Sequence, residues 1–173
     1  KCIKSYLSDR KQMVDVGGFM SEPADVTCGV PQGSILGPLI FLLYVNDMKS
    51  AVNCDLLLYA DDSALLVSGK NVDDIESVLS NELQNVNKWL VDNKLSLHLG
   101  KTESILFGSK PRLSKSSKLK VQCNGTDIQA KTSVKYLGCE IDQHVSGEAM
   151  AHKVIQKVVS RTKFLARKSK LLD

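Results

Sequence analysis

Residues 55–67 read Asp-Leu-Leu-Leu-Tyr-Ala-Asp-Asp-Ser-Ala-Leu-Leu-Val, and they are the most informative segment for the predicted fold. Two apolar runs of strand length flank the adjacent carboxylates Asp61 and Asp62. Short apolar runs separated by about two turn residues are typical of a β-hairpin. We therefore expect antiparallel strands over 55–60 and 63–67, with both carboxylates at the tip between them.

The next segment predicts an amphipathic helix. Asn71 is suited to cap its N-terminus, because its side chain can accept a hydrogen bond from the first turn. Apolar residues then recur at spacings of three and four, which places them on one face. They are Val72, Ile75, Leu79, Leu83, Val86 and Leu90. A second amphipathic helix, rich in Lys and Arg, is expected over residues 147–168.

Other elements are shorter and irregularly ordered. Strands are expected over residues 11–16, 25–30, 103–107, 118–123, 126–130 and 135–141, with a turn at Asn124-Gly125 and a basic, serine-rich loop over 109–117. A Gly- and Pro-rich loop at 29–37 leads into a helix over 38–48 that is apolar on nearly every side and should be buried. The expected strands and helices do not alternate regularly, as they would in βαβ units. We expect an α+β fold, an antiparallel sheet with helices packed on one face.

Composition excludes several classes of protein. Of the 173 residues, 43% are hydrophobic and 24% charged, as in ordinary globular proteins. The longest apolar stretch, 39–45, is far shorter than the roughly 20 residues of a membrane helix. The five cysteines are scattered without a Cys-x-x-Cys pair, which argues against a disulfide framework or a zinc site. We expect a soluble, intracellular protein without a signal peptide.

The net charge of +4 hides an uneven distribution. Residues 15–92 contain 12 acidic and 3 basic side chains, whereas residues 101–135 contain 2 acidic and 8 basic ones. Residues 147–173 contain 2 acidic and 7 basic side chains. An acidic middle followed by basic stretches suits a cation site beside a phosphate-binding surface. Solvated lysines on a linker and on one helix face would produce the same pattern.

The carboxylate pair is the strongest candidate for chemistry. Asp61 and Asp62 repel each other unless a cation lies between them. Mg²⁺ prefers oxygen ligands and keeps waters and substrate phosphates in its shell. Two such ions can activate a 3′-hydroxyl and stabilise a leaving pyrophosphate in phosphoryl transfer. The alternative is that Asp-Asp simply forms a good turn.

Several motifs occur in an order that resembles one family. Gly-Val-Pro-Gln-Gly-Ser-Ile-Leu-Gly-Pro-Leu at 29–39 precedes Tyr-Ala-Asp-Asp at 59–62. Residues 5–12, 93–102 and 135–138 supply further matching motifs on either side. The chain resembles reverse transcriptases, most closely those of non-LTR (LINE-type) retrotransposons. The resemblance implies an RNA-directed DNA polymerase with a palm-like antiparallel sheet, followed by the start of a helical thumb.

The resemblance also implies substrates and site residues. The substrates would be an RNA template, a DNA primer and deoxynucleoside triphosphates, with Mg²⁺ or Mn²⁺ held by Asp61 and Asp62. Lys101 would assist the departing pyrophosphate. The site for the nucleotide and the template would comprise Pro31, Gln32, Gly33 and Tyr59. The primer grip would comprise Tyr136, Leu137 and Gly138. The nucleic-acid backbone would be contacted by Lys153, Lys157 and Arg161. Nuclear action would follow from the family alone.

Each assignment has a plainer alternative. The loop at 31–33 could merely turn the chain into the following helix, and Lys101 could be an ordinary surface lysine. The stretch 136–138 could be a buried Tyr-Leu pair with a glycine bulge in a strand.

The sequence departs from the family pattern at its start. Reverse transcriptases carry another metal-binding aspartate upstream of the Pro-Gln-Gly loop. Asp9 and Asp15 lie in the segment that matches the region after that motif, so neither takes its role. We therefore expect residues 1–146 to be a partial palm without the first catalytic strand and the fingers, and residues 147–173 to begin the thumb with a basic helix.

Two alternatives to an active polymerase remain open. The chain could be a catalytically incomplete remnant that only binds nucleic acid through its basic C-terminal half. It could also be a structural or protein-binding α+β domain in which Asp-Asp is only a turn.

Overall fold

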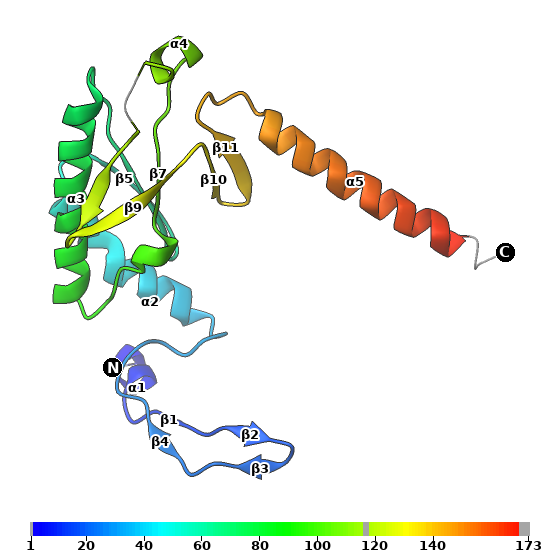
Figure 1. Cartoon of the computed structure of the whole chain (residues 1–173). Coiled ribbons are helices and arrows are strands. Elements are labelled where there is room, and N and C mark those ends of the chain that lie inside the picture. Colours follow the sequence, from blue (N-terminus) through cyan, green and yellow to red (C-terminus); the bar gives the residue numbers. More distant parts are fainter. Residues whose placement is uncertain (1, 116–117, 170–173) are drawn as a thin grey trace. The chain divides into compact units, whose positions relative to one another are not determined.

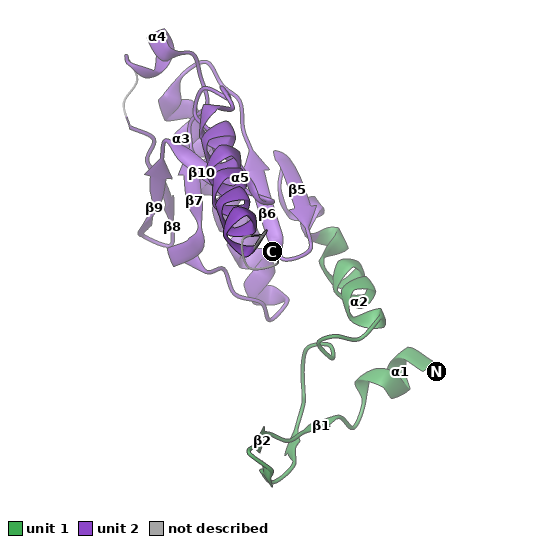
Figure 2. Cartoon of the chain, turned by 90° about the vertical axis from the view of Figure 1, so that its right-hand side faces the viewer, with its two compact units in different colours: residues 1–47 green, residues 48–173 purple. Residues whose placement is uncertain are grey.

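The computed structural model of the chain describes residues 2–115 and 118–169 (Figure 1). The chain divides into two compact units, residues 1–47 and residues 48–173 (Figure 2). Helices and strands are mixed along the chain, as the predicted α+β class requires. Within the described ranges, no helix combines the length and apolar character needed to cross a membrane.

Unit 1 begins with α1 (Cys2–Leu7) and continues into two antiparallel ribbons. The ribbons pair β1 (Lys11–Gln12) with β4 (Ala24–Asp25), and β2 (Asp15–Val16) with β3 (Phe19–Met20). The prediction of continuous strands over 11–16 and 25–30 is wrong. Between the two ribbons the N–H of Ser21 donates to the carbonyl of Val14 at 2.9 Å, but the N–H of Val14 donates to the hydroxyl of Ser21 at 3.0 Å and not to a backbone carbonyl.

The apolar helix of unit 1 is α2 (Leu36–Val45), and it passes into a 3₁₀ helix, η1 (Asn46–Ala51). Gly37 and Val45 are buried, but most of the large apolar side chains of α2 are exposed, including Leu39, Leu42 and Leu43. The prediction that this helix is buried is therefore wrong for the described chain. The two-residue strands of unit 1 offer too little apolar surface to cover it.

Unit 2 opens with the predicted hairpin, β5 (Asp55–Tyr59) paired with β6 (Asp62–Leu66). The helix α3 (Val72–Asp92) follows and packs along β8 and against β6, which are labelled in Figure 2. The predicted helix is confirmed. Asn71 has the extended backbone of an N-cap, but its side-chain amide donates to the carboxylate of Asp74 instead of capping the backbone.

A three-stranded sheet lies in the order β7 (Glu103–Ile105), β9 (Thr126–Lys131), β8 (Val121–Cys123). A 3₁₀ turn, η2 (Leu99–Lys101), precedes β7. The β8–β9 pair is antiparallel and turns at Asn124-Gly125 as predicted, with both residues at positive φ. The β7–β9 pair is parallel, so the expectation of a wholly antiparallel sheet is wrong. The sheets are also several small ones, not a single sheet.

The last part of unit 2 contains a second hairpin and a long helix. The hairpin pairs β10 (Ser133–Tyr136) with β11 (Cys139–Asp142), which corrects the single strand predicted over 135–141. The helix α5 (Glu148–Ser169) confirms the predicted basic helix and contacts β11. The basic loop at 109–117 contains a short helix, α4 (Lys110–Leu113). Residues 116–117 of that loop and residues 170–173 of the predicted thumb lie outside the described residues.

The core of unit 2 forms where α3 meets the three-stranded sheet. Leu83 of α3 is buried in one cluster with Leu119, Val121, Cys123 and Ile128. Leu65 of β6 packs against the same cluster, so the hairpin is tied to the sheet through α3. Burying a side chain of this size contributes about 1.5–3 kcal/mol.

One carboxylate is buried beside this core. Glu82 of α3 is 4% exposed and is the buried charged residue of the described chain. Its carboxylate accepts the backbone N–H of Asn53 at 3.1 Å, the side-chain amide of Asn53 at 3.3 Å and that of Asn85 at 3.3 Å. Asn53 lies two residues before β5, so Glu82 anchors the base of the hairpin to α3.

We predict that Glu82→Gln lowers the free energy of unfolding by about 1–3 kcal/mol, since an amide NH₂ would then face donors of Asn53 or Asn85. Urea unfolding measures this change. Asp92→Asn, at the exposed end of the same helix, is the matched control and should change stability by less than about 0.5 kcal/mol. Equal effects of the two substitutions would contradict the anchoring role.

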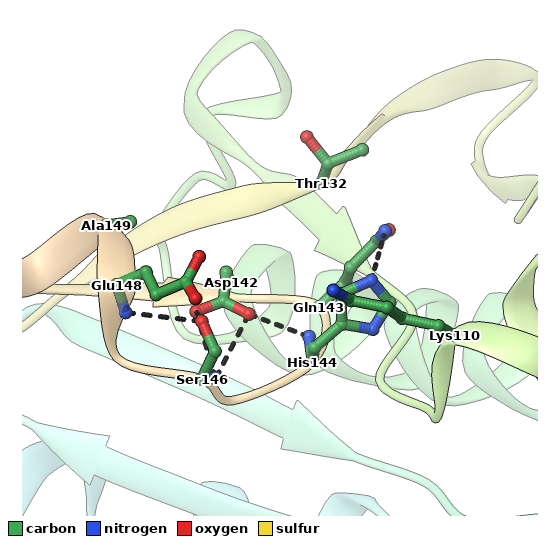
Figure 3. A pocket seen from close by; sticks show the side chains of 8 residues that line it. All are labelled: Lys110, Thr132, Asp142, Gln143, His144, Ser146, Glu148 and Ala149. Carbon is green, nitrogen blue, oxygen red and sulfur yellow. Dashed lines mark hydrogen bonds between the residues drawn. The ribbon is translucent and has the colours of Figure 1, made fainter.

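A second carboxylate organises the junction between β11 and α5. Asp142 accepts the backbone N–H groups of His144, Ser146 and Gly147 and the hydroxyl of Ser146 (Figure 3). These bonds, those from Ser146 N–H first, lower the pKa of Asp142 from 3.8 to about 2. A carboxyl whose pKa is lowered on folding adds stability above its ordinary pKa, and that stability is lost as pH falls toward the folded value.

We predict that Asp142→Asn destabilises the chain at neutral pH, because the amide cannot accept the same set of N–H groups. The difference in melting temperature between the natural chain and Asp142→Asn should shrink as pH falls from about 4 to about 2, where Asp142 itself becomes protonated. Thermal unfolding followed by circular dichroism across this range measures it. A difference that does not depend on pH would contradict the assignment.

Candidate active site

The acidic pair lies at the tip of the β5–β6 hairpin, but the prediction that both carboxylates form the turn between the strands is wrong, since Asp62 begins β6. Tyr59 pairs with Asp62, which leaves Ala60 and Asp61 as a two-residue turn. Ala60 has φ of +52°, a left-handed conformation that costs a non-glycine residue energy. Backbone strain of this kind is concentrated at functional sites in proteins.

The register of the hairpin separates an apolar face from an exposed one. Leu56 is opposite Leu65 on one face, where Leu56 is buried and Leu65 packs against the core. Tyr59 and Asp62 are opposite each other, and alternation along the strands places them on the other face. Tyr59 is 64% exposed and Asp62 is exposed as well. The hairpin therefore presents an acid and an aromatic ring together on its open side.

The donor set at the tip fits a hard divalent cation. Asp61 and Asp62 are both exposed and offer carboxylate oxygens, the ligands that Mg²⁺ prefers. Across residues 2–115 and 118–169, no group of three or more His, Cys, Asp or Glu side chains gathers as a metal cage. Two carboxylates leave coordination positions for waters and substrate phosphates, which is how Mg²⁺ is held in nucleotidyl-transfer sites.

Lys101 ends the 3₁₀ turn η2 just before β7, and its side chain is exposed. Its backbone N–H donates to the carbonyl of His98 at 2.9 Å. Lys101 therefore belongs to unit 2, like the acidic pair, and its ammonium group faces solvent.

The Pro-Gln-Gly loop belongs to unit 1. Gln32 and Gly33 are exposed, Pro31 is half-buried, and Gly33 has φ of +81°. The hydroxyl of Ser34 donates to the carbonyl of Pro31 at 2.8 Å and accepts the backbone N–H of Gly37 at 3.0 Å. A Cβ at Gly37 would lie 2.9 Å from that hydroxyl, so glycine is needed there.

Two residues that the sequence reasoning left without a role hold this loop in place. The hydroxyl of Tyr6 donates to the hydroxyl oxygen of Ser34. The guanidinium of Arg10 donates to the carbonyl of Cys28 at 3.1 Å and to that of Gly29 at 2.6 Å. Only the presence of Tyr6 and Arg10 in a motif upstream of the loop could have pointed to them.

The predicted primer-grip residues form the β10–β11 turn. Tyr136 ends β10 and is half-buried, whereas Leu137 and Gly138 are the exposed turn residues. Both turn residues have positive φ, 48° for Leu137 and 84° for Gly138, as a type I′ turn requires. The glycine is thus in a turn and not in a bulge. Leucine at such a position is strained, and its side chain is 46% exposed.

The predicted backbone-contact residues lie on α5. Lys157 and Arg161 are exposed, as are the other α5 side chains from residue 151 to residue 168. Lys153 forms an ion pair with Glu140 of β11. That contact, together with the hydroxyl of Ser133, lowers the pKa of Glu140. Lys153 therefore helps to fasten α5 to the second hairpin.

A pocket of about 240 Å³ lies beside this junction and includes Asp142, His144 and Ser146 (Figure 3). These are the residue types of a hydrolytic triad, but their hydrogen bonds are different from those of a triad. Ser146 donates its hydroxyl to Asp142, and Nδ1 of His144 donates to the carbonyl of Gly108 at 2.9 Å. The Ser146 hydroxyl thus bonds to the carboxylate of Asp142 and the His144 ring bonds elsewhere, so these groups cap the loop.

We predict that Leu137→Asn raises the free energy of unfolding by about 1 kcal/mol, because asparagine tolerates positive φ and Leu137 has little burial to lose. Leu137→Val, which is β-branched, should lower it. Chemical denaturation of both variants measures the two changes. Effects of the same sign would show that the turn is not strained at Leu137.

Comparison with known proteins identifies the family of the chain. A family model described as "Reverse transcriptase (RNA-dependent DNA polymerase)" matches residues 1–141. The chain is 29% identical over 152 residues to "RNA-directed DNA polymerase from mobile element jockey" of Drosophila melanogaster, covering 83% of this chain and 16% of that protein. No solved structure matches.

Two further relatives point the same way. One is "Probable RNA-directed DNA polymerase from transposon BS" of Drosophila melanogaster, 30% identical across 83% of this chain and 17% of the relative. The other is "Retrovirus-related Pol polyprotein from type-1 retrotransposable element R1" of Bradysia coprophila, 30% identical across 82% of this chain and 14% of the relative. The chain thus spans about a sixth of the length of these relatives. Because the family model covers most of its residues, the chain belongs to the reverse transcriptase family, and its relatives identify the LINE type.

Proposed function

We propose that the chain forms part of the catalytic core of an RNA-directed DNA polymerase, which extends a DNA primer on an RNA template. The observation that carries the proposal is the open face of the β5–β6 hairpin. It presents Asp62 beside Tyr59, with Asp61 in the adjoining turn. The family of the chain and the names of its relatives agree with this chemistry.

Asp61 and Asp62 would hold Mg²⁺ or Mn²⁺. Divalent cations there would supply Lewis acidity at the phosphoryl group and charge neutralisation at the pyrophosphate, in a two-metal reaction. The exposed ammonium of Lys101 is suited to donate a proton to, or pair with, the departing pyrophosphate. Neither role requires a change in the hairpin, because both carboxylates already face solvent.

The Pro31-Gln32-Gly33 loop and Tyr59 would contact the templating base and the incoming deoxynucleoside triphosphate. The amide of Gln32 can both donate and accept, and the exposed Gly33 allows backbone to approach a base or sugar. The bonds from Arg10 and Tyr6 would keep this loop in one conformation and so reduce the entropy lost on binding.

The second hairpin and α5 would handle the primer strand. Tyr136, Leu137 and Gly138 would form the primer grip at the tight β10–β11 turn. Lys157 and Arg161 would contact phosphates, and Lys153 would do so by exchanging Glu140 for phosphate. In this assignment residues 1–146 are palm and residues 147–173 begin the thumb.

We predict that Asp61→Asn or Asp62→Asn lowers primer extension about a hundredfold or more, since each removes a charged ligand from the reacting centre. The measurement is primer extension on an RNA template by a jockey polymerase in which these 173 residues replace the matching segment. Asp73→Asn, an exposed change in the first turn of α3, should retain activity.

The same assay separates the alternatives. If the chain only binds nucleic acid through its basic half, the exchanged polymerase with natural Asp61 and Asp62 should bind primer–template but should not extend the primer. Equal extension by the natural, Asp61→Asn and Asp62→Asn proteins would mean that the acidic pair is only a turn.

A further inference from the structure

Unit 2 has a second hollow, whose lining residues do not include the acidic pair. A pocket of about 620 Å³ lies between the β6–α3 connection and the short helix α4. The lining of this α4 pocket includes Lys70, Ile75, Phe107, Arg112, Leu113 and Lys115. Its volume is within the range of about 300–1,000 Å³ that is usual for sites of small ligands.

Two glycines shape the apolar walls of the α4 pocket. A Cβ at Gly69 would lie 2.9 Å from Cγ1 of Ile75, and a Cβ at Gly108 would lie 3.2 Å from Cδ2 of Leu113. The side chains of Ile75 and Leu113 therefore rest directly on glycine backbone on two sides. Gly108 is itself fixed, because its N–H donates to the carbonyl of Gln143 at 2.9 Å and its carbonyl accepts Nδ1 of His144.

The charge of the lining is of one sign. Lys70, Arg112 and Lys115 line the α4 pocket, and no acidic residue does. Phe107 also lines it and is 43% exposed, which leaves part of its ring open to a ligand. Cations interleaved with an aromatic ring on an apolar floor are typical of sites for single-stranded nucleic acid, where phosphates meet the cations and bases stack.

We propose that the α4 pocket is an accessory site for single-stranded nucleic acid, taking one base on Phe107 and Leu113 and adjacent phosphates on Lys70, Arg112 and Lys115. The choice of ligand rests on the proposed polymerase function. The binding itself requires neither metal nor catalysis. An acidic peptide would satisfy the cations but would give Phe107 no planar partner.

The test measures binding of a fluorescein-labelled single-stranded oligo(dT) by anisotropy in the presence of EDTA. The variant Lys70→Glu, Arg112→Glu, Lys115→Glu is compared with a matched control, Lys49→Glu, Lys88→Glu, Lys94→Glu, which changes the net charge equally at exposed positions outside the pocket. We expect the pocket variant to bind about tenfold or more weakly than the control. The slope of log affinity against log salt should be smaller by about 2, as three lost phosphate contacts require.

Substitutions of Phe107 provide a second test of the proposed site. Phe107→Leu should lower affinity about tenfold by removing the stacking surface, and Phe107→Tyr should restore it. Equal loss in the pocket variant and its control would overturn the proposal, because binding would then follow charge alone. A poly-glutamate peptide that displaces oligo(dT) more effectively than unlabelled oligo(dT) does would also overturn it, in favour of an acidic protein partner.

This result is separable from the proposed function. The double variant Asp61→Asn, Asp62→Asn should bind oligo(dT) in EDTA at least as tightly as the natural chain. If the exchanged polymerase is inactive but the pocket variant still binds oligo(dT) more weakly than its control, the accessory site is supported and the proposed function is not. If the polymerase is active but the two variants bind oligo(dT) equally, only the accessory site is rejected.

Discussion

Leu83 of α3 is buried against Leu119, Val121 and Ile128, and this contact holds a 21-residue helix along a sheet of three short strands. Hairpins and sheets of this size are marginal in water unless another element covers one face. The same helix contacts β6 through the core and binds the base of β5 through Glu82. The position of the acidic hairpin in unit 2 therefore follows from the burial of one face of α3.

The tip of that hairpin is built in a way that stability alone does not explain. Two adjacent carboxylates repel each other, and Ala60 beside them has a strained backbone. In the described part of the chain, no hydrogen bond or ion pair to the side chain of Asp61 or Asp62 offsets these two features. A bound divalent cation would offset the repulsion between the two carboxylates. Cation binding therefore explains why two acidic residues are adjacent here, whereas a plain turn does not.

The parts predicted well were those that depend on local patterns. The spacing from Val72 to Leu90 identified α3, and the apolar runs on either side of Asp61 identified the hairpin. Predictions failed where distant residues decide the outcome. The parallel β7–β9 pair joins strands that are separated in the sequence by α4 and β8, and the exposure of α2 depends on how little of unit 1 packs against it.

The residues of the candidate site also divide into those that the sequence predicted and those that it did not. Motif order pointed to Asp61, Asp62 and the loop at 31–33. The supports of those residues, namely Glu82 below the hairpin and Arg10 and Tyr6 behind the loop, act across 18 to 29 positions of sequence. Hydrogen bonds of that span leave no periodic signal, so a single sequence does not reveal them.

Thermal unfolding of the natural chain and of Asp61→Asn, Asp62→Asn, each with and without millimolar Mg²⁺, determines whether the acidic pair at the hairpin tip binds a divalent cation. A ligand that binds only the folded state must stabilise it. Mg²⁺ should therefore raise the unfolding midpoint of the natural chain and leave that of the double variant unchanged. The same shift in both proteins, or no shift in either, would mean that the acidic pair holds no cation.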